Sequence, residues 1–137
     1  MPNDDSVDIS QEDIDQEFSQ AEQMLADATR AFEVDISKAT IVNCLYYACF
    51  HAAQAALYSH GFNPQSYGHV QMLLGRELIQ NGVIPRKFGR FLNDRETYRR
   101  CVDYGSGGVE RDTDDLIQQT TSFLETMQQV ADTNVSD

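Results

Sequence analysis

The sequence has few cysteines and no metal-binding spacing, which argues against two common kinds of small protein. Its 137 residues include Cys44, Cys49 and Cys101, an odd number without a Cys-x-x-Cys pair or a nearby histidine pair at zinc spacing. Cys44 and Cys49 lie in the most apolar stretch of the chain, where a free thiol behaves as a small hydrophobic group. We therefore expect buried, reduced cysteines, no disulfide framework, and no metal or other cofactor.

The sequence also lacks any long hydrophobic run. No stretch approaches the roughly 20 apolar residues that a membrane-spanning helix needs. Residues 1–5 do not show the basic-then-apolar order of a signal peptide. We expect a cytoplasmic protein that does not bind a membrane, and the length of the chain indicates a single domain.

Basic residues are scarce, and most of them are clustered. Ten basic residues stand against 22 acidic ones, for a net charge of −12, and only Lys38 and Lys87 are lysines. An acidic, lysine-poor surface suggests a halophilic archaeon as the source, because such proteins must stay hydrated in concentrated salt; ordinary acidic solubility is the alternative. Six of the ten basic residues nevertheless lie within residues 86–100, where Asp94 and Glu96 are the only acidic residues. Since salt screens long-range attraction, this local cluster bears more on RNA binding than the net charge does.

Apolar spacing and turn residues predict an all-α protein. Five helices are expected, at about residues 10–33, 37–61, 66–80, 85–104 and 112–131. Ser10 with Asp13 resembles a helix-capping pair, while Gly61 and Pro85 are typical of a helix end and a helix start. We expect an antiparallel up-and-down bundle of about five helices over residues 9–131, with disordered tails at 1–8 and 132–137.

The second predicted helix is almost uniformly apolar and should be the central, most buried one. Its polar groups fall on one face at helical spacing: Asn43, Tyr47, His51, Gln54 and Tyr58. A lone histidine in such a helix is most often a hydrogen-bonded core residue, but several polar groups on one face also suit a binding site. His60 and His69 lie near turns, and we expect both to be exposed.

At roughly 100° per residue, the fourth predicted helix places two arginines on an otherwise apolar face. The apolar residues of this face are Phe88, Phe91, Leu92, Tyr98 and Val102. Arg95 and Arg99 point into the middle of it, whereas the arginines that point away are Arg86, Arg90 and Arg100. An arginine on an apolar face is costly unless it is paired or lines a cavity or interface. Two structural interpretations are open, salt bridges to a neighbouring helix or side chains that extend along the edge of the core to solvent; the functional one is phosphate binding in a pocket or dimer interface.

Three segments resemble the HEPN domain family. Residues 43–53 (NCLYYACFHAA) combine an aromatic pair, small residues and a Phe-His step, as in the second helix of HEPN proteins. Residues 69–75, followed by residues 82–85, resemble the third helix and following turn of that family, and residues 99–105 (RRCVDYG) resemble its Arg-x-x-x-Asp-Tyr-Gly ending. The likeness covers about residues 16–127.

The resemblance implies a helical homodimer that binds RNA or a nucleotide. Many HEPN proteins are metal-independent ribonucleases with an Arg-x4–6-His motif, and many are toxins encoded beside a nucleotidyltransferase antitoxin. The candidate catalytic residues are then Arg99, Asp103 and Tyr104. The candidate phosphate- or nucleotide-binding residues are Arg95, Arg100, Asn43, Tyr47 and His51.

The chain departs from the ribonuclease motif at one position. Tyr104 stands where the histidine of the motif should follow Arg99, and no histidine occurs after His69. A tyrosine, with an ordinary pKa of about 10, is a poor general base at neutral pH. The alternative is therefore a non-catalytic interaction or nucleotide-sensing subunit. Tyr104 could also be nucleotidylated by the partner, which would add negative charge beside Arg99.

Overall fold

The computed structural model describes residues 9–103 and 113–135, and for residues 95, 96, 98–103, 134 and 135 it describes the helical backbone alone. Within these residues the chain forms no strand and five α-helices: α1 (Gln11–Glu33), α2 (Lys38–Ser59), α3 (Tyr67–Leu73), α4 (Lys87–Asp103) and α5 (Thr113–Val135). α3 continues directly into a π-helical segment, η1 (Leu74–Ile79). The predicted all-α helical bundle is confirmed.

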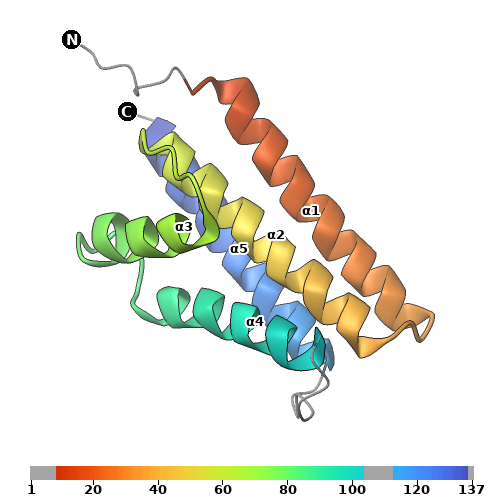
Figure 1. Cartoon of the computed structure of the whole chain (residues 1–137). Helices are drawn as coiled ribbons and strands as arrows, with labels where there is room; N and C mark the ends of the chain where they lie inside the picture. Colours follow the sequence, from red (N-terminus) through yellow and green to blue (C-terminus); the bar gives the residue numbers. More distant parts are fainter. Residues whose placement is uncertain (1–8, 104–112, 136–137) are drawn as a thin grey trace.

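α2 is the central helix, as its composition predicts, and it contacts the other four helices. In Figure 1, α1 and α2 form an antiparallel hairpin and α5 lies along α2 in the same direction, while α3 and α4 lie across the bundle. Five alanines of α2 have no exposed surface: Ala48, Ala52, Ala53, Ala55 and Ala56. Their small side chains let α1 and α5 approach the α2 backbone closely.

The predicted helix ends have the expected capping contacts. The Oγ of Ser10 accepts a hydrogen bond from the backbone N–H of Asp13 at 3.1 Å, and the carboxylate of Asp13 accepts one from the N–H of Ser10 at 3.0 Å. α2 begins after Ser37, whose Oγ accepts from the N–H of Thr40 at 3.3 Å. Gly61 follows the end of α2 with a φ of +87°, a conformation that glycine adopts without strain.

Three boundaries differ from those predicted. The third predicted helix is divided, because its second part widens into the π-helix η1. α4 begins at Lys87, two residues after Pro85, and α5 extends to Val135, four residues beyond its expected end.

Phe32, which continues the apolar spacing of α1, is 39% exposed, whereas Ala31 is buried. The spacing permits either residue, and the helix turns the alanine inward.

α4 is attached to α5 by an aromatic contact. Phe123 of α5 has no exposed surface and stacks on Phe91 at a centroid distance of 5.3 Å; its ring is tilted against Phe88 at 5.8 Å. Leu92 of α4 is buried beside them. These contacts confirm the start of the predicted apolar face of α4, and they hold the helix that includes the clustered arginines.

Candidate functional site

The polar face of α2 is a half-buried strip along an otherwise buried helix. Asn43, Tyr47, His51, Gln54 and Tyr58 are each partly exposed. Three hydrogen bonds involve this strip: Tyr47 with Tyr67, His51 with Glu17, and Gln54 with Tyr58. Four of the five residues therefore have a side-chain hydrogen-bond partner. Asn43 has no hydrogen-bond partner among the described side chains.

His51 is paired with a carboxylate rather than enclosed in the core. Its Nδ1 lies 2.7 Å from Oε1 of Glu17 on α1, and the two side chains are 26% and 19% exposed. An ionised carboxylate can only accept a hydrogen bond, so Nδ1 must donate its proton to Glu17. In the neutral ring the other nitrogen, Nε2, then holds a lone pair with which it can accept a proton.

An aromatic cluster adjoins this pair. The ring of Tyr67, at the start of α3, meets the rings of Tyr46, Tyr47 and Phe50 at centroid distances of 5.7, 6.2 and 4.6 Å, all in T-shaped geometry. Phe50 also meets His51 at 5.4 Å. Tyr67 remains 41% exposed, so the cluster presents aromatic surface to solvent. The sequence did not single out Glu17 or Tyr67, because neither belongs to the face of α2 that they complete.

A pocket of about 600 Å³ opens beside the aromatic cluster, between α2 and the turn before α3. It is lined by Phe50, Gln54, Tyr58, Asn63, Pro64, Gln65, Ser66 and Tyr67. The amide of Gln54 donates to the Tyr58 hydroxyl at 3.0 Å. Burial raises the pKa of the Tyr58 phenol, as do the nearby charges of Glu17 and Asp13, against a lowering by the hydrogen bond from Gln54. The phenol is thus kept protonated at neutral pH and can act as a donor.

Several predicted site residues lie outside the described side chains. These are Arg95, Arg99, Arg100, Asp103 and Tyr104. Arg86 and Arg90, predicted to point away from the core, are exposed. The backbone of α4 contacts α2 and runs toward the end of the bundle at which α2 begins (Figure 1). The fold therefore places the helix of Arg95 and Arg99 against the helix of Asn43, Tyr47 and His51.

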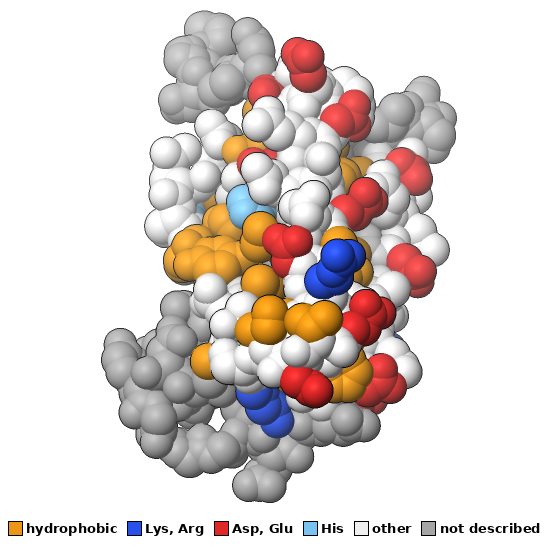
Figure 2. Space-filling model, turned by 90° about the vertical axis from the view of Figure 1, so that its right-hand side faces the viewer, with side chains coloured by type: hydrophobic (Ala, Val, Ile, Leu, Met, Phe, Trp, Pro, Cys, Tyr) orange, Lys and Arg blue, Asp and Glu red, His pale blue; other side chains and the backbone are white. Residues whose placement is uncertain are grey.

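Acidic side chains predominate on the α1 side of the molecule. Figure 2 shows many carboxylates on this face, a few basic side chains, and uncovered hydrophobic groups. Such a surface repels phosphate, so any contact with a nucleic acid backbone must come mainly from the clustered arginines of α4.

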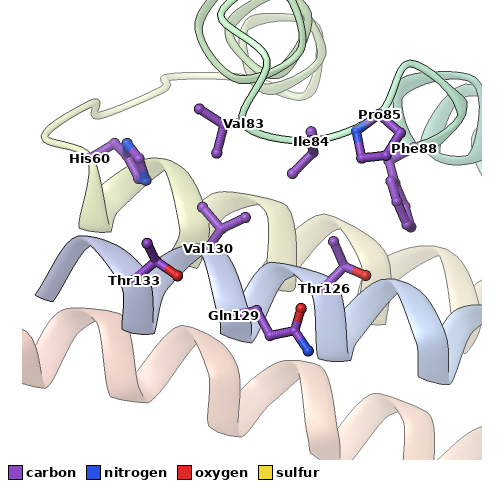
Figure 3. A pocket seen from close by; sticks show the side chains of 9 residues that line it. All are labelled: His60, Val83, Ile84, Pro85, Phe88, Thr126, Gln129, Val130 and Thr133. Atoms are coloured by element: carbon purple, nitrogen blue, oxygen red, sulfur yellow. The ribbon is translucent and has the colours of Figure 1, made fainter. Parts of the chain in front are cut away.

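A second hollow also adjoins the C-terminal end of α2. It has a volume of about 570 Å³ and lies between the end of α2, the segment before α4, and α5 (Figure 3). His60 lies at one end of it, and its Nε2 is buried without a hydrogen-bond partner in the described chain. The expectation that His60 and His69 are exposed is wrong. His60 is half-buried at the end of α2, and the Nδ1 of half-buried His69 accepts the backbone N–H of Gln65 at 3.0 Å.

The cysteines differ in their surroundings. Cys49 is fully buried and Cys44 is half-buried, and both are free thiols. Burial raises the pKa of the Cys44 thiol, and the charge of Asp27 adds to the effect. Cys101 lies outside the described side chains. In the described part of the chain, no helix is long and apolar enough to cross a membrane.

Comparison with known proteins agrees with the helical arrangement. The family model of the HEPN domain matches residues 15–130. The chain is 31% identical over 109 residues to the UPF0332 protein glr0978 of Gloeobacter violaceus, which covers 77% of this chain and 81% of that protein. It is 26% identical over 106 residues to MJ0605 of Methanocaldococcus jannaschii, named as a candidate toxin, which covers 77% of this chain and 78% of that one. The chain belongs to the HEPN domain family.

Proposed function

We propose that this HEPN chain binds single-stranded RNA and is the toxin of a toxin–antitoxin pair. The observation that supports this most is the surface on α2 and α3, where the His51–Glu17 pair adjoins the aromatic cluster of Tyr47, Phe50 and Tyr67. Aromatic side chains stack on unpaired bases, and a histidine with one nitrogen held by a carboxylate suits proton transfer from a ribose hydroxyl. The likeness to a candidate toxin points the same way.

The phosphate backbone would bind to the arginines of α4. No described residue that lines the α2–α3 pocket has a charged side chain, so that surface cannot neutralise phosphates. Arg95, Arg99 and Arg100 lie on the helix that contacts α2, and guanidinium groups bind phosphate oxygens through paired hydrogen bonds. We assign Arg99 as the principal phosphate-binding residue, with Asp103 and Tyr104 four and five positions later in the sequence and Asn43 on α2.

The ribonuclease step would need no metal. The ribose 2′-oxygen attacks the phosphorus atom, the bond from phosphorus to the 5′-oxygen breaks, and the products are a 2′,3′-cyclic phosphate and a 5′-hydroxyl end. His51 Nε2 takes the proton of the 2′-hydroxyl, and water supplies the proton that the leaving 5′-oxygen gains. Arg99 offsets the negative charge on the phosphate oxygens, and Tyr104, protonated at neutral pH, donates a hydrogen bond to one of them.

Replacing Arg99 with alanine tests the assignment of the phosphate site. We expect the affinity for a single-stranded oligonucleotide to fall about 10- to 150-fold at low salt, because a charge-assisted contact is lost. The slope of log affinity against log salt should become shallower by about 0.7. Fluorescence anisotropy of a labelled oligonucleotide over a salt series, with a chelator present, measures both quantities.

Arg90→Ala is the matched control, because Arg90 lies on the same helix and is exposed. It should change affinity and salt slope far less than Arg99→Ala. Equal behaviour of the two variants would contradict a specific role for Arg99. Binding without any cleavage would refute the ribonuclease activity. The chain would then be an RNA-binding module, which is the non-catalytic alternative.

We further propose a nucleotidyltransferase antitoxin that modifies Tyr104 and a homodimer as the assembled state. In the modification the phenolic oxygen bonds to the α-phosphorus of a nucleoside triphosphate, pyrophosphate leaves, and the phenolic proton is lost to solvent. We expect the intact mass after co-expression with the proposed nucleotidyltransferase partner to rise by one or more nucleotidyl groups, and the Tyr104→Phe variant to show no such rise. Light scattering in high salt should give a mass near twice the 15.5 kDa of one chain. An unmodified Tyr104 or a monomeric mass would contradict the respective proposal.

A further inference from the structure

The pocket between α2 and the turn before α3 suits an uncharged, planar ligand. Aromatic rings form part of its wall, and the amides of Gln54, Asn63 and Gln65 supply polar groups. None of its described lining residues has a charged side chain. Its volume of about 600 Å³ lies within the usual range of small-molecule sites, which is roughly 300–1,000 Å³.

The polar groups of the pocket form a donor beside an acceptor. Because Gln54 donates its amide N–H to the Tyr58 hydroxyl, the phenol can donate its own proton to a ligand. The Oε1 atom of Gln54 can accept a hydrogen bond on the other side. A donor next to an acceptor is also what the Watson–Crick edge of a nucleobase presents, so the two edges can pair.

The electrostatics of the pocket favour a base over a phosphate. Glu17 and Asp13 lie close enough to Tyr58 to raise the pKa of its phenol. Their negative charge repels phosphate but costs an uncharged base little. The acidic α1 side in Figure 2 extends this repulsion beyond the pocket.

The wall of the pocket is held in place before any ligand binds. The side-chain amide of Gln65 donates to the backbone oxygen of Asn63 at 2.9 Å, and the backbone N–H of Gln65 donates to His69 at 3.0 Å. Ser66 caps α3 by accepting the N–H of His69 at 3.1 Å. The T-shaped contacts of the aromatic cluster fix the ring of Tyr67. A site ordered in advance loses little conformational entropy on binding.

We propose that this pocket binds one unstacked nucleobase of single-stranded RNA, with its face stacked on Tyr67 and its edge on Tyr58 and Gln54. This inference rests on the proposed RNA binding. It assigns the two parts of the RNA to different sites: the pocket binds the base, and the arginines of α4 bind the phosphate backbone. The ribose of a base bound in this pocket would thereby lie near Nε2 of His51, the nitrogen that accepts the proton.

The test compares two oligonucleotides of equal length, one with ordinary bases and one abasic. We expect Tyr67→Ala to weaken binding of the ordinary oligonucleotide about 5- to 150-fold, the usual effect of losing one aromatic stacking partner. Binding of the abasic oligonucleotide and the salt slope should not change, because no ion pair is removed. Tyr58→Phe keeps the ring but removes the donor, and it should also weaken only the ordinary oligonucleotide. Phe32→Ala is the control, since Phe32 is 39% exposed and lies at the far end of α1.

Each outcome decides a different point. If ordinary and abasic oligonucleotides bind equally well and neither variant matters, the base pocket is refuted while RNA binding stands. If neither oligonucleotide binds the wild-type chain, the proposed function itself fails. A free mononucleotide that binds as tightly as the oligonucleotide would identify a nucleotide as the ligand and refute the RNA assignment. Circular dichroism of each variant checks that the helices are intact.

Discussion

Replacing Phe123 with alanine is expected to lower the free energy of unfolding by about 3–5 kcal/mol. The side chain has no exposed surface and lies between Phe88 and Phe91, which belong to a different helix. Removing it loses apolar burial and leaves a cavity that two rings on α4 cannot fill without moving the helix. Urea denaturation followed by circular dichroism at 222 nm measures the change as a shift of the transition midpoint.

The neighbouring Ser122→Ala change is the control for this prediction. Ser122 is exposed on the same helix, and alanine has the higher helix propensity, so stability should hold or rise slightly. Because Phe123 attaches α4 to the bundle, Phe123→Ala should also weaken RNA binding. A variant as stable as Ser122→Ala would show that the contact between α4 and α5 contributes little to the fold.

The parts of the fold predicted from sequence rest on local signals. Ser10 with Asp13 and Gly61 mark helix ends through backbone hydrogen bonds and a positive φ, which depend on a few adjacent residues. The same holds for α5, in which Leu116, Phe123 and Met127 repeat at helical spacing and are buried. Such signals need no knowledge of the neighbouring helix.

The parts that escaped prediction depend on contacts between segments. Glu17 is one of many acidic residues on α1, and only the packing of α1 against α2 shows that it pairs with His51. Tyr67 completes the aromatic cluster from a different helix, 20 residues after Tyr47. The π-helical turn η1 could not be predicted either, because the spacing of apolar residues does not distinguish a π-helical turn from an α-helix. The face of α2 was predictable, but its partners were not.

Replacing His51 with glutamine is expected to lower kcat for metal-independent RNA cleavage by about 100- to 10,000-fold, with KM nearly unchanged. Glutamine keeps a polar side chain of similar length but cannot take the proton of the 2′-hydroxyl. RNA binding should persist, because the base pocket and the arginines of α4 are untouched. Single-turnover cleavage of a labelled RNA with a chelator present separates the chemical step from binding.

Glu17→Gln tests whether the carboxylate sets the tautomer of His51. A glutamine amide at this position can donate to Nδ1, which would move the ring proton to Nε2 and remove the lone pair that accepts the ribose proton. Cleavage should therefore fall to a similar extent although His51 is still present. His60→Gln is the control, because His60 lies at the C-terminal end of α2; this variant should cleave RNA like the wild type. Full activity in His51→Gln would exclude this histidine from the reaction, and full activity in Glu17→Gln would exclude control of its tautomer by the ion pair.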